Sequence, residues 1–334
     1  MVAVLREASG VSVPVVDVAP LLGGDAGAFA RTARELRAVF ETVGFAYIAG
    51  HGVKPELRER LFNASRRFHA LPLDAKMRVK MNAQHRGYMP FSTSTIVTSS
   101  VAKVTKPNQS ESFMMMHELS PDDPDLLAGK PLQGPNQWPA ELPDFKPTLI
   151  AYEQAARALG ARLARAIAVS FDLAPDWFAP HFAKPTTWLR LLHYPPLPDP
   201  LPPDLFSSAP HTDYGFLTIL AQDDTGGLEV RGKDGSWIPA PPIPDTYVIN
   251  VADILMQWTN GILRSTPHRV RNVAGRDRYS CPYFYDPGID TIVECLPGIV
   301  KPGDSPRWPA TSWCDYVMER LDKNYVYRQR PAQG

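Results

Sequence analysis

Residues 211–220 read HTDYGFLTIL, a β-rich run that opens with a histidine and an aspartate two positions apart. Successive side chains of a strand point to opposite faces, so residues i and i+2 share one face. We therefore expect His211 and Asp213 to stand at the start of a strand and to point into the same cavity. A third side chain from another strand would complete a small polar site there.

Short β-rich runs continue on both sides of this stretch. Seven of them, separated by turn signals, cover residues 187–194, 215–222, 227–231, 236–240, 246–251, 268–273 and 279–285. The tetrapeptide Lys233-Asp234-Gly235-Ser236 is typical of a hairpin turn between two of these runs. Seven short strands within about a hundred residues favour an antiparallel sandwich or barrel. Helices are predicted over 147–171 and 310–327.

The first half of the chain is predicted to be helical after one short strand. The strand covers residues 13–17, and apolar side chains at spacings of three and four predict an amphipathic helix from Ala26 to Val43. Residues 71–145 are predicted to be mostly irregular. We expect one compact unit, mainly β with flanking helices, in which an N-terminal helical and irregular segment (1–145) packs on a β core (146–334).

Composition and charge narrow the class of protein. Lys+Arg and Asp+Glu both number 35, so the formal net charge is zero and the basic excess of a nucleic-acid binder is missing. No apolar run approaches the roughly 20 residues that span a bilayer, and residues 1–7 lack the features of a signal peptide. The three cysteines, Cys281, Cys295 and Cys314, are too widely spaced for a disulfide framework. We expect a cytoplasmic protein with a small-molecule substrate and no nucleic-acid or membrane partner, and the sequence leaves its oligomeric state open.

The candidate for the third polar side chain is His268, which lies in the β-like run 265–270. Two imidazoles and one carboxylate on one face of a metal form the facial triad of non-haem iron(II) oxygenases. They leave three positions of an octahedral ion open, so that a 2-oxo acid can take two of them and O2 the third. The sequence therefore favours an Fe(II) site at His211, Asp213 and His268.

An anion site is predicted ten residues further along the chain. Arg278 and Ser280 occupy positions i and i+2 of a predicted strand, so they share a face. The guanidinium of Arg278 offers a planar fork for a carboxylate, and the hydroxyl of Ser280 adds another donor. A metal site together with a carboxylate clamp favours an oxygenase that uses a 2-oxo acid.

Beyond these residues, seven stretches of the sequence resemble the 2-oxoglutarate/Fe(II) dioxygenase superfamily, in particular its isopenicillin N synthase-like branch. The stretches are residues 13–17, 44–45, 50–53, 211–215, 222–228, 253–261 and 265–270. The resemblance covers nearly the whole chain. It implies a double-stranded β-helix (jelly-roll) core that holds iron at His211, Asp213 and His268.

The resemblance also implies where the co-substrate binds. Arg278 and Ser280 match the residues that hold the distal carboxylate of 2-oxoglutarate, and Tyr194 matches a tyrosine that often assists them. Arg190 is similar to an arginine near the co-substrate of the bacterial ethylene-forming enzyme. Leu192 departs from the family pattern, because many plant relatives carry an asparagine there.

The implied reaction consumes O2 and 2-oxoglutarate and hydroxylates an unactivated C–H of a small molecule, with succinate and CO2 as co-products. Desaturation, ring closure and fragmentation are other outcomes open to this class of enzyme. Four aromatic residues are candidates for the substrate pocket. Tyr88 and Phe113 lie in the irregular region, where this branch tends to place substrate loops, and Phe216 and Phe284 lie in the predicted β core.

Two other functions remain as alternatives. The first is an oxidase similar to isopenicillin N synthase, which has the same triad and does not use 2-oxoglutarate. The second, from a different class, is a non-catalytic small-molecule binding protein on the same fold. A zinc hydrolase is disfavoured, because no general base stands out near the triad.

Overall fold

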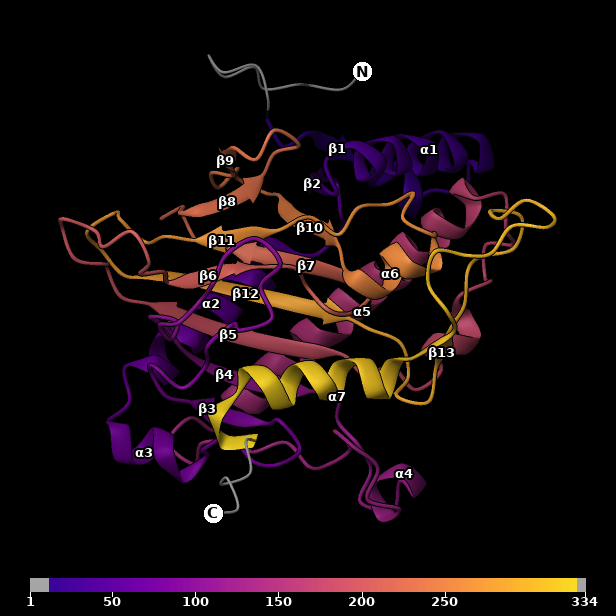
Figure 1. Ribbon diagram of the computed structural model, residues 1–334. Helices are drawn as coiled ribbons and strands as arrows, with labels where there is room; N and C mark the ends of the chain where they lie inside the picture. The colour runs from indigo at the N-terminus through magenta and orange to yellow at the C-terminus, as the bar shows by residue number, and fades with distance from the viewer. Residues whose placement is uncertain (1–11, 329–334) are drawn as a thin grey trace, which may run out of the picture.

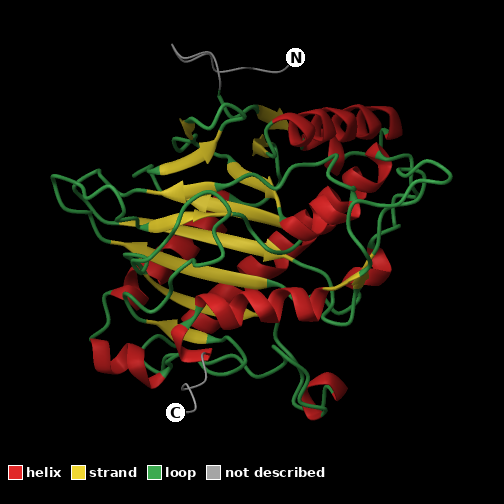
Figure 2. Ribbon diagram, viewed as in Figure 1, coloured by secondary structure: helices red, strands yellow, loops and turns green. Residues whose placement is uncertain are grey.

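Two sheets face each other in the computed structural model, which describes residues 12–328 (Figures 1 and 2). The larger sheet has the strand order β1-β2-β10-β7-β12-β5-β4-β3, and the smaller sheet has the order β6-β11-β8-β9. All neighbouring strands are antiparallel except β1 and β2, which are parallel. The N-terminal residues 1–7, for which the sequence predicts no signal peptide, lie outside the described residues.

The strands of the larger sheet are, in chain order, β1 (Val15–Asp17), β2 (Phe45–Ala49), β3 (Gly87–Met89), β4 (Glu111–Met116), β5 (Trp188–Tyr194), β7 (Leu217–Gln222), β10 (Tyr247–Val251) and β12 (Arg278–Tyr285). Those of the smaller sheet are β6 (Ser208–His211), β8 (Leu228–Arg231), β9 (Trp237–Pro239) and β11 (His268–Val270). A separate pair is formed by β13 (Ile292–Val293) and β14 (Thr311–Ser312).

A buried apolar layer joins the two sheets. Phe45 and Val248 of the larger sheet pack in one cluster with Val230 and Val270 of the smaller sheet. The chain passes from the smaller to the larger sheet between β6 and β7, which is typical of a double-sheet jelly roll. The predicted mainly-β fold with a jelly-roll core and flanking helices is confirmed.

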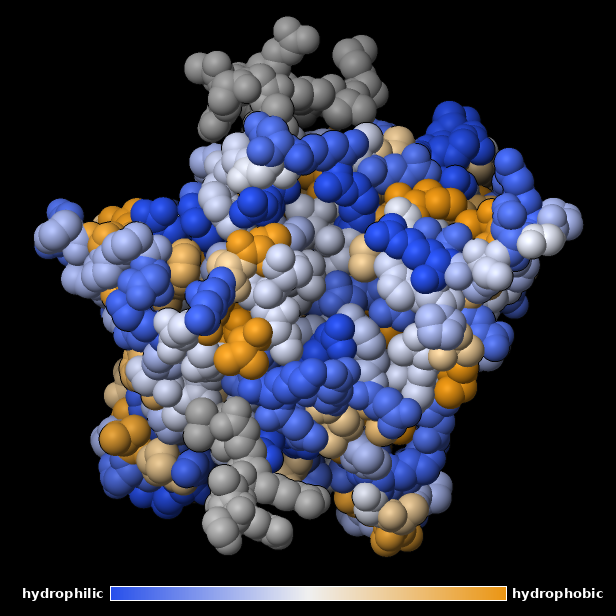
Figure 3. All heavy atoms as spheres, viewed as in Figure 1, coloured by the Kyte–Doolittle hydropathy of each residue, from blue (hydrophilic) through white to orange (hydrophobic). Residues whose placement is uncertain are grey.

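Helices cover both sides of this core. Helix α5 packs on α1 and α2, and both α2 and α5 contact β12, so they lie behind the larger sheet in Figure 1, whereas α7 crosses in front of it. The outer side of α7 is hydrophilic (Figure 3), and Trp313, Val317 and Leu321 of this helix are buried. The helices are α1 (Ala26–Thr42), α2 (Pro55–His69), α3 (Leu73–Arg78), α4 (Pro124–Leu127), α5 (Phe145–Ser170), α6 (Asp253–Trp258) and α7 (Trp313–Asn324), with short 3-10 turns at Ala19–Leu22, Ala179–Phe182 and Val326–Arg328.

Residues 71–145 are less irregular than predicted, since they contain β3 and β4. Strand β4 is buried along its whole length, and three of its six residues are methionines. A strand buried on both faces lacks the alternation of apolar and polar residues that predicts a strand. Both strands extend the larger sheet beyond β5.

The predicted strand that begins at His211 is also corrected. His211 is the last residue of β6, and Asp213 lies in a bend before β7 begins at Leu217. The strand breaks here because the chain changes sheets. No side chain fits at Gly215 without a shift, since a Cβ would lie 1.6 Å from Asp286 Oδ1.

Among residues 12–328, no helix is both long enough and apolar enough to cross a membrane. The three cysteines are free thiols, and Cys281 is buried.

Candidate functional site

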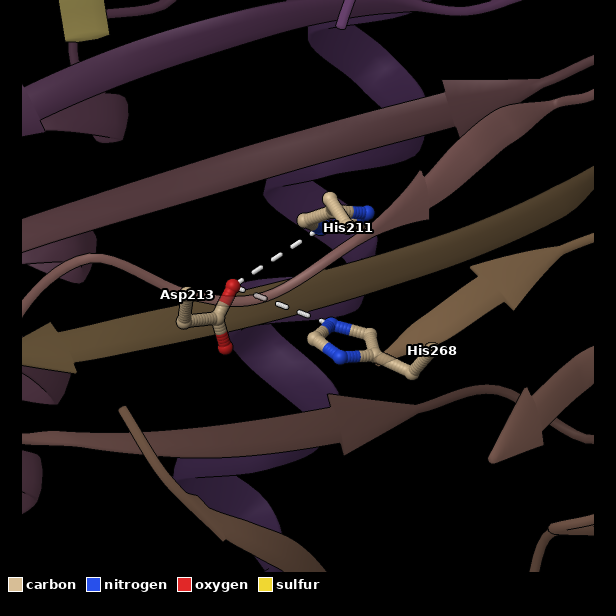
Figure 4. Close-up of side chains that lie close together, drawn as sticks. All are labelled: His211, Asp213 and His268. Carbon is tan, nitrogen blue, oxygen red and sulfur yellow. Dashed lines mark ion pairs between the residues drawn. The ribbon is translucent and has the colours of Figure 1, made fainter. Parts of the chain in front are cut away.

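Three side chains from the facing sheets and their connection meet in one cluster (Figure 4). His211 at the end of β6 pairs directly with His268 at the start of β11, and Asp213 reaches the same point from the bend that follows β6. Asp213 Oδ1 lies 3.7 Å from Nε2 of His211 and 3.7 Å from Nε2 of His268. One ligand atom from each residue lies within 4.8 Å of the others, which is close enough to surround a single metal ion.

Backbone carbonyls orient the two imidazoles. Nδ1 of His211 lies 2.7 Å from the carbonyl oxygen of Ala209, and Nδ1 of His268 lies 3.3 Å from that of Thr266. Because a carbonyl only accepts, each Nδ1 donates its proton and leaves a lone pair on Nε2, which is the atom that faces Asp213. Burial and the neighbouring His268 lower the pKa of His211 to about 4, so this imidazole is neutral at pH 7 and can bind a metal.

The carboxylate of Asp213 is oriented from its other oxygen. Oδ2 accepts hydrogen bonds from Thr218 Oγ1 (2.5 Å) and Asn250 Nδ2 (2.8 Å), which leaves Oδ1 directed at the histidines. Burial tends to raise the pKa of Asp213, but the two histidines and the two hydrogen bonds outweigh burial and lower it, so the group is ionised. Thr218 and Asn250 are paired neighbours on β7 and β10. Neither residue is predicted from the sequence, although each is a polar residue within an apolar run.

At the other end of the same cavity lies a buried cation. Arg278 is fully buried and donates to Ser280 Oγ (3.2 Å) and Gln222 Oε1 (3.1 Å), while Tyr194 places its ring 4.9 Å from the guanidinium carbon. Its Nε has no hydrogen-bond partner, and no carboxylate pairs with it among residues 12–328. A buried charge without a counterion is costly, so the site fits an anionic ligand.

A single cavity of about 80 Å³ connects the cation to the histidine–aspartate cluster. Its walls include the three clustered residues, Arg278 and Ser280. Two neutral imidazoles and one carboxylate on one side of an ion fit a facial Fe(II) site with open positions. The arrangement can therefore hold a metal at one end and the carboxylate of a metal-bound anion at the other.

Comparisons with known proteins agree with this geometry. Residues 13–141 match the family model described as the N-terminal region of non-haem dioxygenases in morphine synthesis, and residues 185–287 match that of the 2OG-Fe(II) oxygenase superfamily. A 2-oxoglutarate-Fe(II) type oxidoreductase of Emericella nidulans, hxnY, is 33% identical over 93% of this chain and 90% of its own. The chain belongs to the 2-oxoglutarate–Fe(II) oxygenase superfamily.

Other members of this superfamily match the chain over most of its length. A homoarginine-6-hydroxylase of Glycine max is 34% identical over 85% of this chain and 88% of its own. A crystal structure of a full-length Neurospora crassa protein with α-ketoglutarate and thymine has a TM-score of 0.83 at 30% identity, covering 95% of this chain and 98% of its own. The predicted family, enzyme class and cofactors are confirmed: the chain is an Fe(II)- and 2-oxoglutarate-dependent dioxygenase, and its relatives favour neither the oxidase nor the non-catalytic alternative.

The co-substrate residues expected for this oxygenase are arranged in order along the sheet. Tyr194 pairs with Arg278, and Leu192 pairs with Ser280 as an apolar wall of the cavity. Arg190 lies four residues from Tyr194 on β5, which places it roughly 14 Å along the strand at about 3.4 Å per residue. Its Nε donates to Ser112 Oγ (3.0 Å). Arg190 therefore lies at the metal end of the cavity rather than beside Arg278.

Of the four aromatic residues expected in the substrate pocket of the oxygenase, only Phe284 lines the cavities beside the metal cluster. Phe113 lies on the opposite face of β4 and packs against Phe68, and Tyr88 donates its hydroxyl to Glu111. Phe216 packs against aromatic side chains in the core. These three residues are buried in the core, and for Tyr88 and Phe113 alternation along the strand turns the side chain away from the cavity walls.

A buried ionic network lies on the other face of the oxygenase's larger sheet, behind the co-substrate cavity. Glu111 on β4 is 2% exposed and accepts hydrogen bonds from Lys76 Nζ (2.8 Å) and Tyr88 Oη (2.5 Å). Nδ1 of His193 lies 2.8 Å from Glu111 Oε1. Nε2 of the same histidine lies 3.2 Å from Asp277 Oδ1 and forms an ion pair with it but no hydrogen bond. Two carboxylates face two basic groups, so the network is electrically neutral only when His193 is protonated.

This network makes the stability of the fold depend on pH. Burial tends to lower the pKa of His193, but Glu111 and Asp277 outweigh burial and raise it above the ordinary 6.5. A basic group whose pKa is raised by folding stabilises the folded protein. This stabilisation is fully present when the pH is below the pKa of the group in the unfolded chain, and it is lost as the pH rises through its pKa in the folded protein. We expect the free energy of unfolding of the wild type to exceed that of His193→Gln most at about pH 6, and this difference should shrink toward about pH 9. Urea unfolding across this pH range measures the difference.

His181 provides the control for this series. Burial lowers the pKa of His181, so the wild type should lose stability relative to His181→Gln as the pH falls, which is the opposite trend. A pH-independent difference between the wild type and His193→Gln would contradict the assignment.

Proposed function

We propose that His211, Asp213 and His268 hold the Fe(II) of this dioxygenase, and that Arg278 and Ser280 bind the distal carboxylate of 2-oxoglutarate. The observation that carries the assignment is one cavity with a three-ligand cluster at one end and, at the other, a buried guanidinium that has no carboxylate partner among residues 12–328. The two histidines lie on the paired strands β6 and β11, and Arg278 and Ser280 lie on β12 of the other sheet, so the two sheets set the distance between the metal site and the carboxylate site.

Each surrounding residue has a role in orienting the bound groups. We propose that Tyr194 stabilises Arg278 through its ring, and that Arg190 contacts the co-substrate at its metal-bound end. Thr218 and Asn250 hold Asp213 in place, and the carbonyls behind the two histidines fix their tautomers. When bound, Fe(II), 2-oxoglutarate and O2 supply the oxidising power for attack on a substrate C–H. The protein positions that C–H and keeps water out.

The substrate is proposed to bind in a second cavity, which Phe284 lines on the other side of His211 and Asp213. This cavity also has a volume of about 80 Å³, which favours a small molecule as its occupant. We propose hydroxylation as the reaction. Thymine, bound in the Neurospora crassa structure, is a compound of suitable size to test first.

The domain boundary and the location of the protein are also proposed. We infer that residues 1–145 and 146–334 act as one unit, since β1 to β4 extend the same sheet as β5, β7, β10 and β12. The three free thiols support a cytoplasmic location.

The proposed function predicts a spectroscopic signal. Anaerobic titration of the Fe(II)-loaded wild type with 2-oxoglutarate should produce the weak visible charge-transfer band of a metal-chelated 2-oxo acid. Succinate, which lacks the 2-oxo group, is the control and should give no band. Absence of the band in protein that demonstrably contains iron would contradict the proposed co-substrate site.

A further inference from the structure

The second cavity has an aromatic wall built from separate parts of the fold. Trp188 and Phe284 come from neighbouring strands β5 and β12, Trp313 opens α7, and Tyr325 follows that helix. Trp188 and Phe284 meet edge to face, with ring centroids 6.3 Å apart. Faces and edges of aromatic rings pack well against a flat ring, so the shape of the cavity favours a planar occupant.

Two hydrogen-bond donors on this wall are unpaired. Trp188 is 6% exposed and Trp313 is fully buried, and neither indole N–H has a partner within the described part of the chain. An indole N–H can only donate. Buried donors are nearly always paired in folded proteins, and here two of them, from β5 and α7, belong to residues that line one small cavity.

The other polar groups on this wall are mostly engaged. Asn324 donates to Thr98 Oγ1 (2.8 Å) and to Tyr214 Oη (2.6 Å). Asp286 Oδ1 accepts from the Phe216 N–H (2.8 Å).

Arg190 adds further donors at the boundary between the two cavities, since both are lined by it. Its Nε is bound to Ser112, and among residues 12–328 its guanidinium pairs with no carboxylate. Arg190 and the two indole N–H groups can only donate, and donors recognise oxygen acceptors.

We propose that the substrate of this oxygenase is a flat ring that carries carbonyl or carboxylate oxygens, and that the indole N–H groups of Trp188 and Trp313 bind those oxygens and determine substrate specificity. This inference rests on the proposed function, because the cavity is a substrate site only if the adjacent cluster holds the metal.

Matched pairs of probes test the acceptor requirement. Thymine and 5-methylcytosine have the same shape, but an amino group replaces one carbonyl oxygen of thymine, and the neighbouring ring N–H becomes an acceptor nitrogen, so the two compounds differ in the number of carbonyl oxygens. The pair 4-methylbenzoate and 4-methylbenzamide makes the same comparison for a carboxylate. Anaerobic calorimetry with the Fe(II)- and 2-oxoglutarate-loaded protein should show tighter binding of the member with the additional carbonyl or carboxylate oxygen in one of the pairs, by about tenfold or more. A difference within the thymine pair would indicate a neutral ring as the substrate, and a difference within the benzoate pair would indicate an acid.

Tryptophan-to-phenylalanine variants test the two donors directly. Trp188→Phe and Trp313→Phe keep an aromatic ring and remove the N–H, and each should weaken binding of the preferred probe by roughly tenfold. Trp237→Phe on β9, outside both cavities, is the matched control and should bind like the wild type. The charge-transfer band with 2-oxoglutarate should be unchanged in all three variants.

The band separates failure of this inference from failure of the proposed function. If the band forms but both tryptophan variants bind the probes like the wild type, or none of the four probes binds, the inference is wrong. If the wild type gives no band, the proposed function itself fails.

Discussion

Replacing Arg278 with alanine is expected to weaken 2-oxoglutarate binding by roughly 30-fold to several thousand-fold, the equivalent of about 2–5 kcal/mol for removing one partner of a buried charge pair. Arg278 is fully buried, and no residue among 12–328 neutralises it, so its charge is available to the ligand. The loss should appear as a shift of the anaerobic titration to higher 2-oxoglutarate concentrations. Fe(II) affinity should change little, because Arg278 lies at the far end of the cavity.

Arg276→Ala is the matched control for this variant. Arg276 lies two residues earlier, with its side chain 55% exposed, and pairs with Asp224 at the surface. Its removal should leave the affinity for 2-oxoglutarate within about twofold of the wild-type value, since exposed ion pairs contribute little free energy. Equal losses in the two variants would show that general charge, rather than the buried guanidinium, attracts the co-substrate.

The proposed metal ligands and the proposed carboxylate clamp are recognisable in the sequence mainly through two short spacings. His211 and Asp213 are two positions apart, as are Arg278 and Ser280. For Asp213, however, the reason given by alternation along a strand was wrong. It points at the cluster because the chain bends between two sheets, and this crossing depends on partners far away in the sequence.

The residues that support the site could not be predicted, because they reach it only through tertiary pairing. Thr218 and Asn250 become neighbours when β7 pairs with β10. The same applies to Trp188 and Trp313, which the fold brings to one cavity from positions 125 residues apart. Aromatic residues in the sequence carry no mark that separates a cavity wall from the core, which is why Tyr88 and Phe113 were expected near the substrate.

Replacing Asp213 with alanine is expected to have the largest effect, lowering turnover by roughly a thousandfold or more, the equivalent of about 4 kcal/mol. The variant removes the only carboxylate of the cluster, so two neutral imidazoles remain to hold a doubly charged ion. It also leaves the hydrogen-bond donors of Thr218 and Asn250 without their acceptor. Fe(II) affinity, measured by anaerobic titration, should fall together with 2-oxoglutarate consumption and with the charge-transfer band.

Asn250→Leu and Asp224→Ala are the comparison variants for Asp213→Ala. Asn250→Leu keeps all three ligands and removes one hydrogen bond to Asp213, so Fe(II) affinity or activity should fall by only about 10- to 100-fold. Asp224 has an 82% exposed side chain, and Asp224→Ala should behave like the wild type. The order Asp213→Ala, then Asn250→Leu, then Asp224→Ala is required if Asp213 binds the metal directly. Wild-type Fe(II) affinity in folded Asp213→Ala would refute that role, because a carboxylate serving only to hold Thr218 and Asn250 would leave the metal in place.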